Sequence, residues 1–151
     1  MLQLYRICRN VYDPKDSTGS SKTPGRWHIL NQHVLYFGSS LALCVLELRA
    51  NGVSFETIRQ KYHYTALEID TEKFSVEEVA KSFYKKDWTF NRQLTQDYGS
   101  KWYNKEKSLI LKVQSAVLPV ESNFILNTTL SGFSKLKFSK PGAILLDKRV
   151  S

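Results

Sequence analysis

The stretch "PGRWHILNQHVLYFGSSLALCVLELRA", residues 24–50, contains a turn, a strand and a helix in immediate succession. The Pro-Gly pair predicts a turn, "HVLYFG" at 33–38 predicts a short strand, and the serine pair that follows supplies the N-cap of a helix ending near Asn51-Gly52. This helix is apolar on almost every side, which is typical of a buried helix. Glu47 lies on it. Because an isolated charge is costly to remove from water, this carboxylate must be paired, neutralised or used in chemistry.

Length and composition predict one globular domain over residues 1–151. The chain has 42% hydrophobic and 24% charged residues, which excludes a disordered or fibrous protein. No segment approaches the ~18 consecutive apolar residues of a membrane span, and no secretion signal is recognisable, so we expect a cytoplasmic protein without membrane association. The net charge of +8 indicates an anionic partner, such as nucleic acid, a phosphate-bearing molecule or an acidic protein. A solvated basic surface explains the same charge equally well.

The cysteines and histidines do not form a metal-binding pattern. Cys8 and Cys44 lie in separate apolar runs, which predicts two reduced core residues. The three histidines, His28, His33 and His63, lack the spacings that place zinc ligands on one face. We therefore expect no metal.

The rest of the chain mixes strand-like and helix-like segments without a regular βαβ pattern, which predicts an α+β fold. We expect strands at 2–9, 62–70, 108–114, 123–127 and 143–147, and helices at 75–84 and 90–99. Residues 13–25 are polar and rich in turn formers, and we expect a loop over a binding cleft there. No Rossmann or P-loop motif occurs.

Four residues combine the chemistry that a sugar nucleotide requires: Arg6 in the first strand, Arg26 in the turn, Tyr36 and Glu47. An arginine binds phosphate oxygens through a fork of two hydrogen bonds, and a tyrosine offers a stacking surface. A carboxylate stabilises positive charge as a glycosidic bond breaks. Structural interpretations stay open for each residue: a buried ion pair between Glu47 and one of the arginines, stacking of Arg26 on Trp27, and a core position for Tyr36.

A nucleic-acid interface is the alternative of a different class. The stretch "FYKKDWTFNRQ" at 83–93 interleaves aromatic and basic residues, as do surfaces that stack bases. No RNP-like pattern accompanies it, and aromatic residues at this spacing usually belong to cores. A basic RNA-binding module or ribonuclease therefore remains the second hypothesis.

Two parts of the chain resemble the RES domain family. "GRWHILNQHVLYFGSSLALCVLELRA" is similar to its Gly-Arg-Trp turn, its Val-Leu-Tyr strand and its helix of the Ala-Leu-x-x-x-Glu type. Residues 98–127 are similar to its Gly-x-x-Trp, Val-x-Ser-Ala-Val-x-Pro and Glu-x-Asn elements. The resemblance implies an ADP-ribosyltransferase-like α+β fold with a central, mostly antiparallel sheet and flanking helices.

The same resemblance implies a function. RES domains are the toxins of bacterial type II toxin–antitoxin systems, and they deplete NAD by cleaving its nicotinamide–ribose bond, by hydrolysis or phosphorolysis. Their partner is typically an Xre-like helix-turn-helix antitoxin. We therefore expect NAD as substrate, a hetero-oligomer with such an antitoxin, and no direct binding of nucleic acid. An acidic antitoxin surface would be attracted by the positive charge of this chain.

The resemblance also assigns roles to residues. Arg6 and Arg26 would hold the pyrophosphate, and Glu47 would stabilise the oxocarbenium-like transition state, which makes these three the catalytic candidates. Tyr36 would stack on nicotinamide or its ribose, and Ser115 would position the ribose or the leaving amide, which makes these two the substrate-binding candidates. No covalent nucleophile is required.

Two departures from the family pattern concern the acceptor. His28 stands where the family often has asparagine, and Thr128-Thr129 stand where many members have His-Pro. The resemblance thus leaves open whether water, phosphate or a protein receives the ADP-ribose. Protein ADP-ribosylation is the alternative that uses the same residues.

Overall fold

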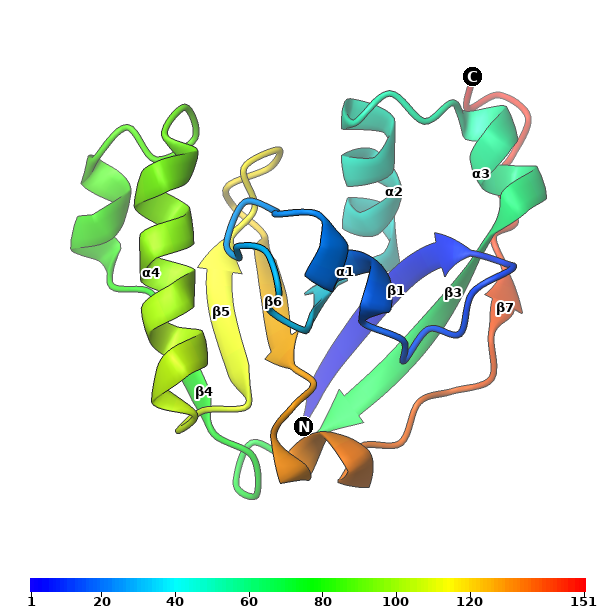
Figure 1. Cartoon of the computed structure of the whole chain (residues 1–151). Helices are drawn as coiled ribbons and strands as arrows, with labels where there is room; N and C mark the ends of the chain where they lie inside the picture. The colour runs from blue at the N-terminus through cyan, green and yellow to red at the C-terminus, as the bar shows by residue number, and fades with distance from the viewer.

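One seven-stranded sheet runs through the molecule in the order β4-β5-β6-β2-β1-β3-β7. The computed structural model describes residues 1–151 (Figure 1). Neighbouring strands are antiparallel except for the parallel pair β4 and β5. The strands are β1 Leu2–Arg9, β2 Val34–Gly38, β3 Tyr62–Ile69, β4 Val76–Glu78, β5 Ile110–Gln114, β6 Ser122–Asn127 and β7 Gly142–Ala143. The expected α+β class and mostly antiparallel sheet are confirmed.

The sheet is divided into two halves where β1 meets β2. These two strands pair only at Tyr5 and Gly38, whereas β1 pairs with β3 from end to end, from Leu2–Ile69 to Arg9–Tyr62. Figure 1 shows β5 and β6 running in a different direction from β1 and β3. Residues directly opposite on neighbouring strands share a face, and side chains alternate along each strand. Tyr36 therefore lies on the same face as Tyr5, and the side chain of Arg6 lies on the opposite one.

The helices cover the two halves separately. α4 lies along β4 and β5, while α2 and α3 accompany β1 and β3 (Figure 1). Side chains cap the N-termini: Ser40 accepts from the Leu43 N–H at the start of α2, and Asn91 accepts from the Leu94 N–H at the start of α4. The helices are α1 Thr18–Lys22, α2 Leu41–Ala50, α3 Phe55–Lys61 and α4 Arg92–Lys105, with 3-10 helices at Lys81–Lys85 and Ser131–Lys135. No helix is both long and apolar enough to cross a membrane.

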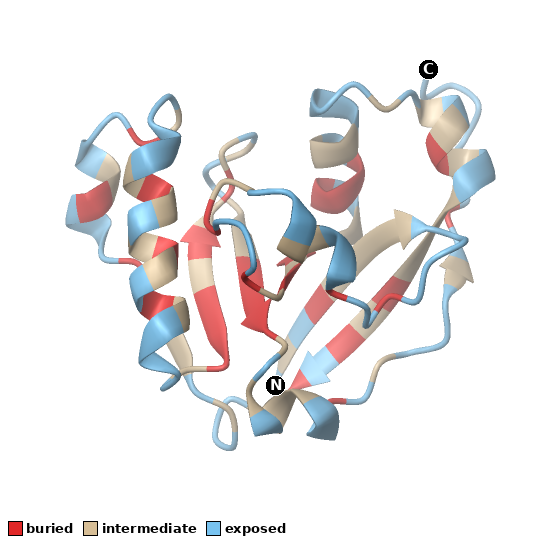
Figure 2. Ribbon diagram, viewed as in Figure 1, coloured by how far each residue is buried: buried red, intermediate tan, exposed pale blue.

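Buried residues lie on both faces of the sheet and are most frequent on β2, β5 and β6, and α4 buries Thr95, Gly99 and Trp102 (Figure 2). One cluster contains Leu4, Leu35 and Phe37. A second contains Trp27 and Trp102 and packs α4 against the sheet, and a third contains Val45, Ile58 and Ile144. A Cβ on Gly99 of α4 would lie only 1.7 Å from the Trp27 carbonyl oxygen, so only glycine permits the helix to approach this turn so closely.

Two local predictions were wrong, one helix was not predicted, and one expected loop contains a short helix. Residues 75–84 form β4 and a 3-10 helix instead of an α-helix, because Val76 and Glu77 pair with β5 and Phe83 packs into the core. Of 143–147 only the first residue belongs to a strand, and α3 was not expected. The expected loop at 13–25 contains α1. The expected helix at 90–99 is confirmed and extends to Lys105.

Candidate active site

A cavity of about 340 Å³ lies between the β2–β6 half of the sheet and helix α2, which packs against β1 of the other half. Turn 24–27, β2, α2, the N-terminus of α4, the segment after β5 and strand β6 all contribute to its wall. The lining residues are Pro24, Gly25, Arg26, Trp27, Tyr36, Glu47, Asn51, Arg92, Ala116, Val117 and Asn123. Three of the five residues predicted from the sequence, Arg26, Tyr36 and Glu47, thus lie together, and Ser115 contacts one of them.

Glu47 is half-buried, and each of its carboxylate oxygens accepts a hydrogen bond. Ser115 Oγ donates to Oε1 at 2.9 Å, and Asn123 Nδ2 donates to Oε2 at 3.2 Å. Burial raises the pKa of Glu47, and the two donors lower it without cancelling that effect. No arginine lies within ion-pair distance of this carboxylate. The buried ion pair considered from the sequence does not form, so the carboxylate is oriented but remains without a counter-ion.

Ser115 is fully buried, and its surroundings fix the direction of its hydroxyl proton. Its oxygen accepts from the Val117 N–H at 3.2 Å and the Leu118 N–H at 3.1 Å. A hydroxyl has two acceptor lone pairs and one proton. Because both lone pairs are used by the turn that follows β5, the proton is directed at Glu47.

Tyr36 is held by the turn that carries Arg26. Its hydroxyl oxygen accepts from the Trp27 N–H at 3.2 Å and lies 2.7 Å from His28 Nδ1. His28 Nε2 lies 2.8 Å and 2.9 Å from the carbonyl oxygens of Ser20 and Thr23, so it must carry the proton. In neutral His28, Nδ1 is then an acceptor, and Tyr36 donates to it. Burial raises the pKa of Tyr36, which keeps this donor neutral.

Arg26 and Arg92 bring two positive charges to the cavity. Arg26 Nη1 donates to the Thr89 carbonyl at 3.0 Å, and its guanidinium lies 5.9 Å from the centre of the Trp88 ring. Arg92 is the first residue of α4 and is exposed. Neither forms a salt bridge, and burial together with the charge of Arg92 lowers the pKa of Arg26. Two unpaired guanidinium groups at one cavity favour an anionic ligand.

Arg6 does not line this cavity. Its side chain lies on the other face of the sheet, where Nε donates to the Pro14 carbonyl at 3.0 Å and Nη1 donates to the Tyr36 carbonyl at 3.5 Å. The second contact crosses the division between β1 and β2. Arg6 thus connects the two halves of the sheet from behind the cavity.

Two cavity residues were missed by the sequence analysis, Asn123 and Arg92. Asn123 is the asparagine of the Glu-x-Asn element in the family resemblance, which is a signal that the sequence does contain. Arg92 follows the N-cap of α4, and nothing in its sequence context distinguishes it from other exposed arginines. The aromatic stretch 83–93, considered as a base-stacking surface, instead places Phe83 and Trp88 in the core.

The fold of this chain is shared with a chain of a solved toxin-antitoxin complex. A chain of the crystal structure of the M. tuberculosis MbcT-MbcA toxin-antitoxin complex superposes with a TM-score of 0.74 at 14% identity, over 94% of this chain and 83% of that one. The molecule therefore has the ADP-ribosyltransferase-like fold that the resemblance implied.

The chain belongs to the RES domain family, whose model matches residues 3–143. Among its relatives, Toxin Res of Photorhabdus laumondii is 29% identical over 136 residues, 87% of this chain and 85% of the relative. Toxin Res of Yersinia enterocolitica is 27% identical over 149 residues, 91% and 96% of the two chains. Prs ADP-ribosylating toxin of a Sphingobium species is 25% identical over 145 residues, 91% and 87%. The expected family and the toxin class are confirmed.

Proposed function

We propose that this toxin binds NAD in the cavity and cleaves its nicotinamide–ribose bond. The observation that carries the proposal is the environment of Glu47, whose carboxylate is oriented by Ser115 and Asn123 and has no counter-ion. A carboxylate so placed accepts a hydrogen bond from a ribose hydroxyl. It also stabilises the positive charge that develops on the ribose as nicotinamide leaves. NAD is the expected substrate, and no metal is required.

Arg26 and Arg92 are proposed to hold the pyrophosphate. Arg26 is already positioned by Thr89 and Trp88, whereas the exposed guanidinium of Arg92 makes no hydrogen bond and is proposed to close over a bound phosphate. In this proposal Arg92 takes the place that the resemblance gave to Arg6. Tyr36 lines the same cavity as the arginines and Glu47, and its ring is proposed to stack on nicotinamide or its ribose. Positioning and preorganised charge then supply most of the rate enhancement.

The partner is proposed to be an antitoxin that covers the cavity, of the Xre-like helix-turn-helix type. Exposed apolar side chains occur on the segments that form the cavity: Val117 lines it and is 40% exposed, and Leu46 lies on α2 next to Glu47 in the chain. Phe90 and Val120 are 88% and 89% exposed. A protein that buries these side chains would close the cavity, and the charge of +8 favours an acidic surface on it.

The test is incubation of the purified chain with NAD, with free nicotinamide and ADP-ribose products measured by liquid chromatography. Glu47→Gln keeps the shape of the side chain and removes its charge, so it should lower turnover by orders of magnitude in a folded protein. Near-full turnover by Glu47→Gln would overturn the role of Glu47. No nicotinamide release by the wild type, with either water or phosphate as acceptor, would overturn hydrolysis and phosphorolysis.

Transfer of ADP-ribose to a protein is the second candidate, because one relative is an ADP-ribosylating toxin. The same cavity residues serve it, and only the acceptor differs. Mass spectrometry of a lysate treated with the toxin and NAD decides between the two. Modified protein without free ADP-ribose supports transfer, and free ADP-ribose or its phosphate ester supports NAD depletion.

A further inference from the structure

Arg6 is a half-buried cation without an anionic partner. Its guanidinium donates to two carbonyl oxygens, and no carboxylate lies within ion-pair distance. Burial lowers its pKa, as expected for a charge that is removed from water and not neutralised. An uncompensated charge of this kind is costly in a stable fold. An anion bound nearby would offset the cost of burying this guanidinium.

A second cavity, of about 430 Å³, lies on the face of the sheet that carries Arg6. Its floor is formed by His63 and Thr65 of β3, which pair directly with Cys8 and Arg6 of β1. Its walls are the segments 12–15 and 138–141. The Pro14 carbonyl that accepts from Arg6 belongs to one of these walls. The two cavities share no residue and lie on opposite faces of the sheet.

Among the charged and titratable side chains of this second cavity, hydrogen-bond donors outnumber carboxylate acceptors. Lys15, Lys140 and His63 line it, and Asp13 is its only carboxylate. Asp13 Oδ1 already accepts from the Lys15 backbone N–H at 2.9 Å. Thr65 is 1% exposed, and its hydroxyl has no hydrogen-bond partner at all. A buried polar group left unpaired calls for an explanation, and a ligand that pairs with it supplies one.

We infer that this cavity, formed by His63, Thr65, Lys15 and Lys140 next to Arg6, is a second binding site and takes a phosphate monoester. A phosphate offers three acceptor oxygens and a charge near −2, which suits several donors and a nearby guanidinium better than a carboxylate does. The Phe138 ring, which lies 5.5 Å from Lys15 Nζ, provides an apolar surface for the body of a mononucleotide. A volume of about 430 Å³ is within the range of small-ligand sites.

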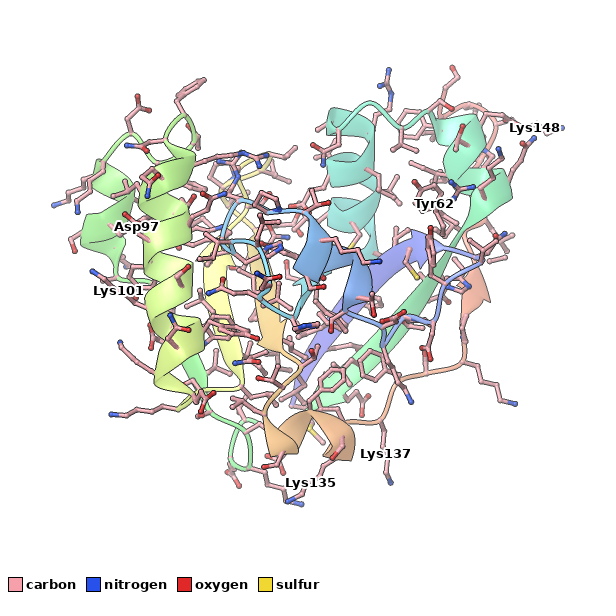
Figure 3. All side chains as sticks on the ribbon, viewed as in Figure 1. Tyr62, Asp97, Lys101, Lys135, Lys137 and Lys148 are labelled. Atoms are coloured by element: carbon pink, nitrogen blue, oxygen red, sulfur yellow. The ribbon has the colours of Figure 1, made fainter.

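The experiment is titration of the full-length chain with AMP, adenosine and inorganic phosphate, followed by amide chemical shifts in NMR spectra. AMP and phosphate should shift residues 12–15, 63–65 and 138–141, and adenosine should not. Lys140→Ala should weaken AMP binding by about fivefold or more, since a charge-assisted hydrogen bond is lost. Lys137→Ala is the matched control, because Lys137 lies three residues away, is exposed and points outward from the molecule (Figure 3).

Thr65→Val provides a second variant with the same shape. It removes the unpaired hydroxyl, so the free protein should be at least as stable as the wild type, while AMP binding becomes weaker. The inference is overturned if AMP shifts only residues of the Glu47 cavity or no residues, or if Lys137→Ala weakens binding as much as Lys140→Ala. The experiment measures binding of AMP and not turnover. A negative result therefore does not bear on the proposed cleavage of NAD, and the binding test can be carried out even if the protein does not cleave NAD.

Discussion

Ser115 and Glu47 lie 68 residues apart in the chain and are joined by a hydrogen bond of 2.9 Å between Oγ and Oε1. The serine follows β5 in one half of the sheet, and the glutamate lies on α2, which packs against β1 of the other half. This contact crosses the division between the halves at the cavity. The candidate catalytic carboxylate thus depends on both halves being correctly placed.

Ser115→Ala should therefore impair both stability and turnover. The Val117 and Leu118 N–H groups lose their acceptor, which should cost about 1–3 kcal/mol in the free energy of unfolding. Glu47 loses a donor that favours its charged form, so the acid limb of the pH–rate profile should move to higher pH. Urea unfolding and NAD turnover across pH measure the two effects. Ser134→Ala, at an exposed serine, is the control, and an unmoved acid limb in Ser115→Ala would contradict the assignment.

Glu47 should make stability depend on pH. Burial raises its pKa, so the folded protein binds this proton more tightly than the unfolded chain does. Stability then falls as pH rises from the unfolded pKa through the folded pKa and stays lower above it. Glu47→Gln cannot ionise and should lose less stability between about pH 4 and about pH 8. Urea unfolding of both proteins across this pH range tests the prediction. If the free energy of unfolding varied with pH in the same way in both, burial would not destabilise the ionised carboxylate of Glu47.

Arg92→Ala should weaken binding of NAD more than it slows chemistry. We expect KM to rise about tenfold with a smaller change in kcat, because a charge-assisted contact to the pyrophosphate is lost far from the breaking bond. Lys101→Ala is the matched control, since Lys101 lies on the same helix and points to solvent (Figure 3). Equal effects of the two variants would indicate general electrostatic attraction instead of a specific contact.

Gly99→Ala should separate α4 from the cavity. The added Cβ would overlap the Trp27 carbonyl, and relieving such a clash typically costs about 1–3 kcal/mol or more. Because Thr95 and Gln96 of α4 donate to the carbonyls of Arg26 and Gly25, displacing the helix also displaces the arginine pair. Thermal unfolding and KM for NAD measure this. Gly19→Ala, where no atom lies within 4 Å of the new Cβ, should leave both unchanged.

Local sequence signals predicted the structure correctly where several of them favoured the same conformation. The turn, strand and helix of 24–50 formed as expected, because the Pro-Gly pair, the serine N-cap and the apolar helix all favour the same conformations. Residues 75–84 show the opposite case. A capping-box pattern favoured a helix there, but pairing of Val76 with Ile110 and burial of Phe83 stabilise a strand and a 3-10 helix.

The sequence by itself determined which groups are candidates for the chemistry: a glutamate on an apolar helix, an arginine in a turn, a tyrosine at a strand and a serine after one. Only the tertiary structure decided which of them meet. Strand alternation placed the Arg6 side chain on the far face of the sheet, and the N-terminus of α4 brought Arg92 to the cavity instead. The reason is physical: residue types determine what a group can do, whereas strand register and helix packing, set by contacts distant in sequence, determine what it faces.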